Sequence, residues 1–187
     1  MPNVIIWIYI VLQCVLLIAL LGIIWRVLPI IFLYNRPLPF VPTQQKVVNL
    51  IIESGVLKNK KNIVDLGCGD GVLISGLRKK YKDAEFFGVE ISSNLARIAR
   101  LRFLLAKSKP KIEQGDMFMY PISDADAIVG FWIPKLMPKI SEKFIKECKP
   151  GCIIVSNMFE LPQDAEKYFS KERIDHKKEK IFIYQKM

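Results

Sequence analysis

The chain has 187 residues, of which 51% are hydrophobic, and it carries a formal net charge of +10 at pH 7. This length allows one domain of ordinary size. Its four cysteines form no C-x-x-C pair, so we expect neither a disulfide framework nor a metal site. The positive charge suits anionic lipid headgroups or nucleic acid. No basic stretch is interleaved with aromatic residues, however, and we therefore expect no specific nucleic-acid partner.

The first predicted element is a transmembrane helix. Val4–Trp25 contains no charge and only one strongly polar side chain, Gln13. As a helix it would span about 33 Å at about 1.5 Å per residue, enough for a hydrocarbon core of about 30 Å. A cleavable signal is not expected, because no basic residue precedes the stretch and no small-residue cleavage site follows it. We predict an anchoring region over residues 1–35, in which the apolar patch 27–34 either lies in the membrane interface or extends the helix.

The basic residues beside this helix predict its orientation. Arg26, Arg36 and Lys46 follow the apolar stretch, and no Lys or Arg precedes it. Basic flanks tend to stay on the cytoplasmic side. We therefore expect a single-pass protein, with the bilayer as a partner and residues 36–187 as a cytoplasmic domain.

That domain is predicted to alternate strands with helices. A proline-rich connector precedes Thr43, which we expect to cap a helix from Gln44 to Leu57. The strands that follow are predicted at 63–66, 85–90, 112–114, 127–132, 152–157 and 181–184, and the helices at 71–81, 93–108, 138–147 and about 163–169. Continuously apolar strands separated by helices predict an α/β fold, a Rossmann-like, doubly wound and mostly parallel sheet.

The most informative motif lies at the end of the first strand. Glycines at 67, 69 and 71 form G-x-G-x-G, whereas the dinucleotide fingerprint requires glycine at position 72, here Val72. An acid two residues before the first glycine would repel a pyrophosphate but suits an ammonium group. S-adenosylmethionine carries an ammonium and a sulfonium and no phosphate. The predicted cofactor contacts in this segment are Asp65, Gly67, Cys68, Gly69 and Gly71.

Two further acids follow predicted strands. Glu90 lies 23 residues after Gly67, close to the spacing of a carboxylate that binds ribose hydroxyls. Asp116 could accept a hydrogen bond from the adenine amino group, with Met117 or Phe118 against the ring. Taken singly, each acid could also be a helix cap or a solvated loop residue.

These segments together resemble a known family. Residues 65–71, Glu90 and Gly115-Asp116 resemble the successive cofactor motifs of class I S-adenosylmethionine-dependent methyltransferases. Within that class, residues 39–43, 90–95 and 130–138 are similar to the membrane-associated lysine methyltransferases of the ATP synthase c-subunit and the adenine nucleotide translocase, and to their prokaryotic relatives. The resemblance covers about residues 36–160.

The resemblance implies roles for particular residues. Asp65 and the glycines would hold the methionine part of the cofactor, and Phe40 and Thr43 would line or cover it. Trp132 and Pro134 would border the target nitrogen. One departure concerns Val72, since relatives often have arginine there, and this affects the identity of the substrate more than cofactor binding.

The resulting hypothesis is a membrane-anchored protein-lysine methyltransferase that acts on a membrane-proximal substrate. An apolar slot of Phe131 and Trp132 would lower the pKa of a lysine ammonium, although no dedicated general base is evident. His176 lies in a charged stretch, and we expect it at the surface. Three alternatives stay open: methylation of a lipid headgroup or hydrophobic small molecule, a non-catalytic cofactor-binding protein, and a dinucleotide oxidoreductase.

Overall fold

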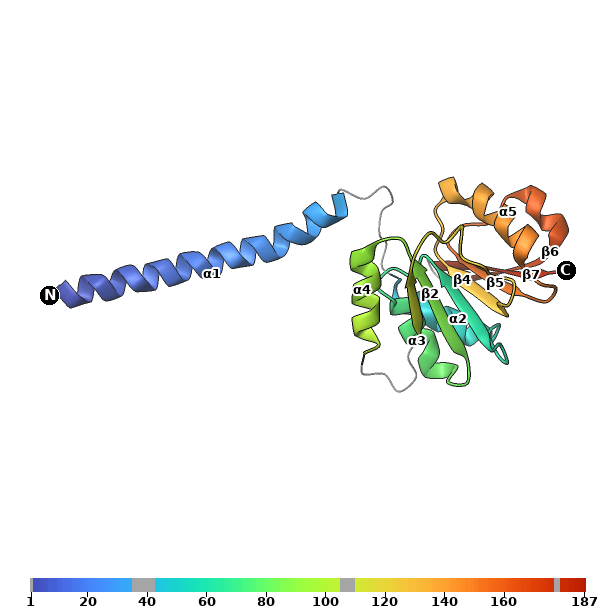
Figure 1. Cartoon of the computed structure of the whole chain (residues 1–187), viewed down its shortest axis with the longest axis horizontal. Coiled ribbons are helices and arrows are strands. Elements are labelled where there is room, and N and C mark those ends of the chain that lie inside the picture. Colours follow the sequence, from blue (N-terminus) through green and yellow to red (C-terminus); the bar gives the residue numbers. More distant parts are fainter. Residues whose placement is uncertain (1, 35–42, 105–109, 177–178) are drawn as a thin grey trace. The chain divides into compact units, whose positions relative to one another are not determined.

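The structure, a computed structural model, describes residues 2–34, 43–104, 110–176 and 179–187. The chain divides into two compact units, Met1–Val41 and Pro42–Met187. The first contains helix α1 (Pro2–Tyr34) (Figure 1). Within it, the 19 residues Ile6–Ile24 are exposed, have a mean hydropathy of 2.7, and are long and apolar enough to cross a membrane. The apolar patch 27–34 extends this helix instead of forming a separate segment.

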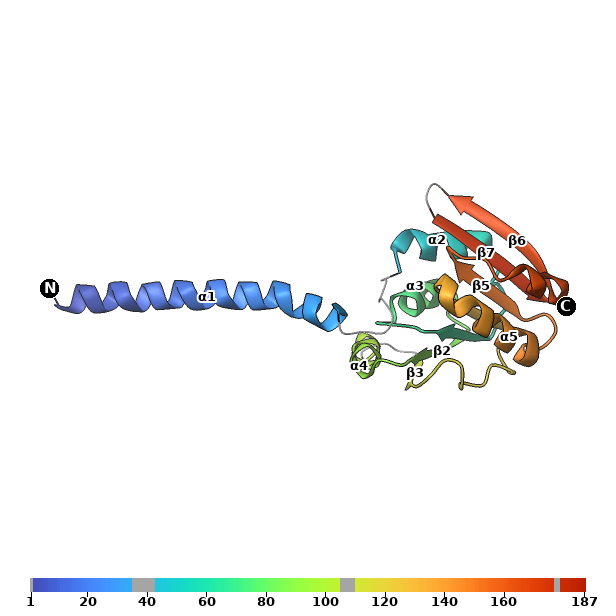
Figure 2. The ribbon, with the colours of Figure 1, turned by 90° about the horizontal axis from the view of Figure 1, so that it is seen from above.

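The second unit is built on one seven-stranded sheet with the order β3-β2-β1-β4-β5-β7-β6. Its strands are β1 (Asn62–Leu66), β2 (Glu85–Glu90), β3 (Lys111–Gln114), β4 (Ala127–Gly130), β5 (Ile153–Asn157), β6 (Phe169–His176) and β7 (Glu179–Lys186). Strands β1 to β5 are parallel, whereas β7 pairs antiparallel with β5 and β6 antiparallel with β7. Figure 2 shows the β6–β7 hairpin at the opposite side of the sheet from β3. The predicted Rossmann-like, mostly parallel sheet is confirmed.

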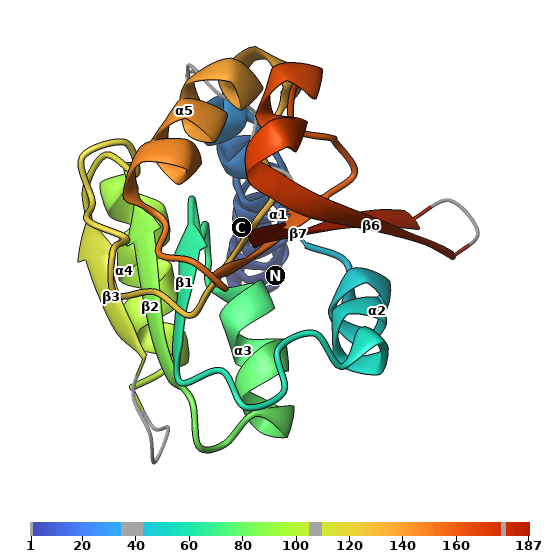
Figure 3. The ribbon, with the colours of Figure 1, turned by 90° about the vertical axis from the view of Figure 1, so that its right-hand side faces the viewer.

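Helices cover both faces of this sheet. They are α2 (Gln45–Ser54), α3 (Val72–Lys80), α4 (Ser93–Arg102) and α5 (Met137–Glu147), with short 3₁₀ helices η1 (Pro134–Leu136) and η2 (Gln163–Tyr168). One core contains the apolar side chains of α2 and α3. The other core contains those of α5, on the opposite face (Figure 3). The sheet is therefore doubly wound, because each face buries its own set of alternate strand residues.

Some predicted boundaries were wrong for local reasons. Thr43 does not cap α2, because the helix begins at Gln45 and the capping position is Gln44, whose side chain makes no capping hydrogen bond. The helix ends before Leu57, because Gly55 adopts a left-handed conformation (φ 68°) and its N–H donates to Ile52 O. A C-terminal glycine of this kind is a common stop signal.

Strand β6 is not predicted by the sequence pattern. The pattern favours the end of a short helix and a basic tail over residues 169–176, yet this segment pairs along its whole length with β7. It is an edge strand, and six of its eight residues are polar or charged and exposed. An edge strand rich in charge resists pairing with other chains, and for the same reason it lacks the apolar run that identifies a buried strand.

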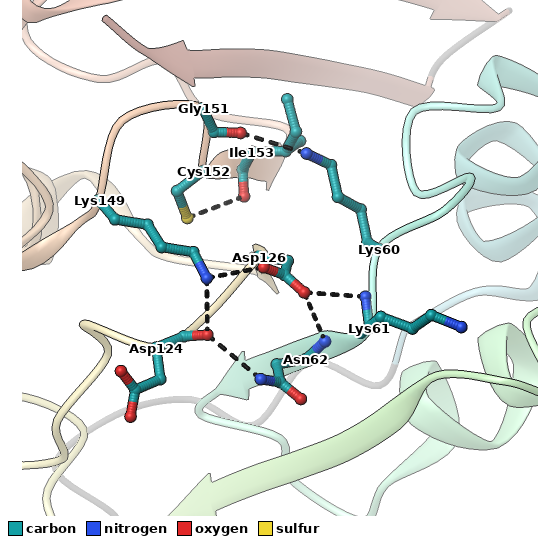
Figure 4. Close-up of polar contacts among 9 residues, drawn as sticks. All are labelled: Lys60, Lys61, Asn62, Asp124, Asp126, Lys149, Gly151, Cys152 and Ile153. Carbon is teal, nitrogen blue, oxygen red and sulfur yellow. Dashed lines mark hydrogen bonds and ion pairs between the residues drawn. The ribbon is translucent and has the colours of Figure 1, made fainter.

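A polar cluster fastens the amino ends of β1 and β5 (Figure 4). Asp126 Oδ2 accepts the backbone N–H groups of Lys61 and Asn62 at 2.9 and 3.0 Å. Its Oδ1 lies 2.7 Å from Lys149 Nζ, which precedes β5. The lysine and the backbone donors lower the pKa of Asp126 to about 2. This cluster closes the amino edge of the sheet and leaves the carboxyl ends of the same strands for a ligand.

Candidate active site

The glycine turn, residues 67–71, leaves the carboxyl end of β1 and leads into α3. The N–H groups of Gly67 and Cys68 both donate to Val89 O of β2, at 2.8 and 3.0 Å. Gly67, Gly69 and Gly71 all have positive φ, of 85°, 57° and 79°. A Cβ at Gly71 would also lie 2.9 Å from the ring of Phe103. The alternating glycines are thus required by backbone conformation and, at Gly71, by close packing.

Glu90 ties the turn to the next strand. Its Oε2 accepts the Gly69 N–H at 3.0 Å and its Oε1 accepts the Ser92 N–H at 2.8 Å. The carboxylate is buried, and its backbone O accepts the N–H of Gly115 at 3.1 Å. A carboxylate has about four lone-pair positions, so two remain for ligand hydroxyls. Glu90 therefore holds the glycine turn by a hydrogen bond and can still accept further hydrogen bonds at the predicted ribose position.

Asp65 is a buried carboxyl at this edge with an oxygen that lacks a hydrogen-bond partner among the described residues. Its side chain is 2% exposed, and its Oδ2 makes no hydrogen bond with the described part of the chain. Burial, with added repulsion from Glu90 and Asp70, raises its pKa to about 8. A buried carboxyl without a partner is costly unless a donor or a cation reaches it. The site is thus complementary to a ligand that carries an ammonium group.

The other two side chains of the turn have structural roles. Asp70 accepts Arg102 Nη2 at 2.7 Å, while Arg102 Nε donates to Asp70 O at 2.8 Å, so the turn is fastened to the end of α4. The Cys68 thiol points into the core, where burial and the nearby carboxylates raise its pKa. Any contact of Cys68 with a ligand would therefore come from its backbone, and the thiol is not a nucleophile.

Asp116 begins a loop that returns from β3 toward α5. Its Oδ1 accepts the Phe118 N–H at 2.9 Å, which closes a tight local turn. Lys139 lies over the Phe118 ring at 4.0 Å, and the buried Lys143 donates to Phe118 O at 3.3 Å while it pairs with Glu147. The loop is thus held from α5 by two lysines that the sequence pattern does not identify.

Met117, the next residue of this loop, lies close to the glycine turn. Its sulfur lies 3.8 Å from the position that a Cβ on Gly67 would occupy. The predicted adenine-binding residues and the predicted methionine-binding turn are therefore neighbours, although 50 positions separate them along the chain.

Trp132, which is predicted to border the target nitrogen, has a side chain that is 1% exposed, and its Nε1 donates to Leu66 O at 2.9 Å. Its ring packs edge-on against Phe144 of α5 at 5.2 Å. Trp132 therefore holds the end of β4 against the end of β1 from inside the core. Pro134, by contrast, is exposed at the start of η1.

The ends of β4 and β5 carry the remaining groups of interest. The rings of Phe131 and Phe159, both partly buried, lie 5.7 Å apart. The last residue of β5, Asn157, is buried, and its Oδ1 has no hydrogen-bond partner among the described residues. Thr43 is half-buried just before α2, while Phe40 lies outside the described residues.

Parallel pairing brings these groups together. Because β1, β2 and β4 run in register, their carboxyl ends meet at one edge of the sheet, where ligands bind in open α/β folds. This edge unites Asp65, the glycine turn, Glu90 and the loop that begins at Asp116. Among the described residues, no group of three or more His, Cys, Asp or Glu side chains could hold a metal ion.

Comparison with known proteins agrees with this geometry. The ANTKMT methyltransferase domain matches residues 65–167, more than half of the chain. The chain belongs to the ANTKMT methyltransferase family. It is an S-adenosylmethionine-dependent methyltransferase, and the expectation of this cofactor is confirmed. The ammonium of that cofactor fits the unpartnered, buried Asp65.

Individual relatives support the assignment. A protein-lysine N-methyltransferase from Saccharolobus islandicus is 32% identical over 130 residues, which cover 68% of this chain and 81% of the relative. The human lysine N-methyltransferase of the ATP synthase c-subunit is 25% identical over 74% of this chain and 59% of its own length. An RNA methyltransferase from Salinibacter ruber, solved with S-adenosyl-L-homocysteine, shares the fold with a TM-score of 0.70 at 24% identity, covering 78% of this chain and 93% of that one.

Proposed function

We propose that this methyltransferase transfers the methyl group to the side-chain amine of a protein lysine and works while anchored to a membrane. The observation that carries the proposal is the match to lysine methyltransferases over 68% and 74% of the chain, joined in the same chain to an apolar helix of membrane-spanning length. The described helix supplies the anchor, and the carboxyl edge of the sheet supplies the chemistry.

Each residue of the carboxyl edge would contact a different part of the cofactor. Asp65 would pair with the ammonium of its methionine part, beside the backbone N–H groups of the glycine turn. Glu90 would accept the ribose hydroxyls with its free lone pairs. Asp116 would accept from the adenine amino group, with Met117 against the ring, and Thr43 and Phe40 would cover the cofactor.

Methyl transfer itself requires positioning more than acid–base chemistry. When bound, S-adenosylmethionine supplies a methyl group on a sulfonium, which is already a good leaving group. The chain has to hold an uncharged amine in line with it and exclude water. The apolar surroundings of Phe131 and Phe159 would lower the pKa of a lysine ammonium, so that its proton leaves to solvent before transfer. Pro134, exposed after β4, would border this amine, and Trp132 would fix the end of β4 from behind.

The orientation in the membrane is part of the same proposal. The basic residues Arg26, Arg36 and Lys46 all follow the apolar stretch, which favours a cytoplasmic methyltransferase domain. In sealed inside-out vesicles, an added protease should remove this domain, whereas right-side-out vesicles should protect it. The reverse pattern of protection would contradict the proposed orientation.

The substrate class is tested by transfer of radiolabel from methyl-labelled S-adenosylmethionine to a membrane extract. We expect label in one or a few protein bands, and methyllysine after acid hydrolysis of those bands. The Asp65→Asn variant is the matched control, because it keeps the shape of the side chain and loses its charge. Label in the organic phase would instead indicate a lipid or hydrophobic small molecule. Bound cofactor without any transfer would indicate a non-catalytic protein.

A further inference from the structure

Helix α4 has an apolar inner face and an outer face that mixes polar residues with exposed large apolar ones. Its inner face buries Leu95, Ala96 and Ala99. Its outer face presents a second stripe with the helical spacing i, i+3, i+4 and i+7, made of Asn94, Arg97, Ile98 and Leu101. Ile98 is 47% exposed and Leu101 is 68% exposed. Ile91 before the helix and Leu104 after it are 63% and 58% exposed, so large apolar side chains continue beyond both ends.

All charged residues of α4 are basic. Its ten residues contain three arginines and no acid. The side chains of Arg100 and Arg102 are bound within the protein, because Arg100 Nε donates to Ile112 O at 3.0 Å and Arg102 pairs with Asp70. Arg97, on the outer stripe between the exposed apolar residues, makes no hydrogen bond or ion pair within the described part of the chain. A helix face turned wholly to water ordinarily carries polar side chains, so Ile98 and Leu101 are the unexpected residues on this face.

We infer that the outer face of α4, with Ile91 and Leu104, docks on an anionic lipid surface. Exposed apolar side chains beside Arg97 match the boundary between headgroups and acyl chains, where the apolar side chains are buried and the arginine meets a phosphate. The inference rests on the proposed membrane anchoring, which keeps the domain beside such a surface. The anchor and α4 would then be two separate membrane contacts in one chain.

This docking would orient the active site. Helix α4 is joined to the cofactor edge at both ends: the N–H of Ser92, its N-cap, donates to Glu90, and Arg102 holds the glycine turn through Asp70. The helix is about 15 Å long at about 1.5 Å per residue. A membrane in contact with α4 would therefore lie within a short distance of the cofactor edge, where it can present a lysine close to the headgroups.

A fluorescence experiment on the full chain tests the inference. With Cys14→Ser as background, an environment-sensitive dye is attached to Leu101→Cys, because the other three cysteines are buried. The matched control carries the dye on Glu142→Cys, an exposed position of α5 on the opposite face of the sheet. The protein is reconstituted in vesicles of phosphatidylcholine with about one third phosphatidylserine, and acyl-chain brominated lipid serves as quencher.

We expect quenching at position 101 to exceed that at position 142 at least threefold. The excess should fall toward the control value in vesicles of phosphatidylcholine alone and when Arg97→Glu is added. Flotation of the same samples tests the anchor separately. Protein that floats with the vesicles but is quenched equally at both positions overturns the docking of α4 alone. Protein that fails to float overturns the anchoring and, with it, this inference.

Discussion

The unpartnered carboxyl of Asp65 predicts that cofactor binding is coupled to proton release. In the ligand-free enzyme its pKa is about 8, so at pH 7 it is about nine-tenths protonated. An ammonium in contact with this carboxyl would return its pKa toward the ordinary acidic range. Binding at pH 7 should then release about 0.9 proton per ligand.

The same shift sets the size of the pH effect on affinity. Between pH 6 and 7 the association constant should rise about ninefold, and between pH 6 and 8 about 50-fold, because each unit of pKa is worth about 1.36 kcal/mol. The rise should level off above pH 8, where the free enzyme is already ionised. Calorimetry with S-adenosylhomocysteine, which keeps the amino group and lacks the sulfonium, measures both affinity and proton release when it is repeated in two buffers of different ionisation enthalpy.

The Asp65→Asn variant separates binding from stability. Because the folded pKa is raised above the value of 3.8 for the unfolded chain, the folded state binds more protons between about pH 4 and pH 8, and the free energy of unfolding falls across that window. Asparagine removes this penalty, so we expect the ligand-free variant to melt higher at pH 8, by about 1–3 kcal/mol or roughly 3–10 °C, yet to lose the pH-dependent binding. A flat affinity from pH 6 to 8 in the native protein, with no proton released, would refute the assignment of Asp65 to the ammonium.

Three other substitutions test the structural roles assigned above. Trp132→Phe removes the hydrogen bond to Leu66 O and should lower stability by about 1–3 kcal/mol in thermal melts; a change in turnover without a change in stability would instead indicate direct substrate contact. Asp126→Asn weakens the link to Lys149 and should cost about 1–2 kcal/mol at neutral pH. Since the folded pKa of Asp126 is about 2, this difference should disappear as pH falls from about 4 to 2 in denaturant titrations. Asn157→Leu removes a buried acceptor without a partner and should raise the melting temperature while cofactor affinity stays unchanged; a lower melting temperature would mean that the amide is hydrogen-bonded in solution.

Much of the sheet could be predicted because its signals are local. Strands β1, β2, β4 and β5 are short apolar runs that end in turn residues or acids, and the register of parallel strands then places those ends at one edge. Asp65 and Glu90 could be predicted for the same reason, because each lies within such a run, whereas Asp116 follows the short and mostly polar β3. The exposed edge strand β6 lacked this signal, because its alternation is dominated by charged residues.

The contacts that organise the site were not predictable from one sequence. The partner of Trp132 is 66 positions away, and the indole's burial depends on α5 packing over β4. The clasp of Glu90 on Gly69 requires the exact offset between two strands. Lys143 resembles any solvated lysine of an amphipathic helix until the fold places Phe118 O and Glu147 around its ammonium. Each of these roles arises from tertiary distances, which composition and spacing do not contain.

The distribution of charge is relevant both to cofactor binding and to the proposed membrane anchoring. The chain as a whole is strongly basic, with 28 basic and 18 acidic residues, yet Asp65, Asp70 and Glu90 gather at the carboxyl edge. In the free enzyme, Arg102 pairs with Asp70, and Asp65 and Glu90 have no cationic partner among the described residues. Under the proposed function, such a site would attract a cationic cofactor inside a protein whose outer charge would attract anionic lipid. The opposite arrangement, a basic pocket within an acidic protein, would favour a phosphate-bearing ligand and repel the membrane. Burial and the neighbouring carboxylates raise the pKa of Asp65, and in the proposed binding mode the cofactor's ammonium would lower it again.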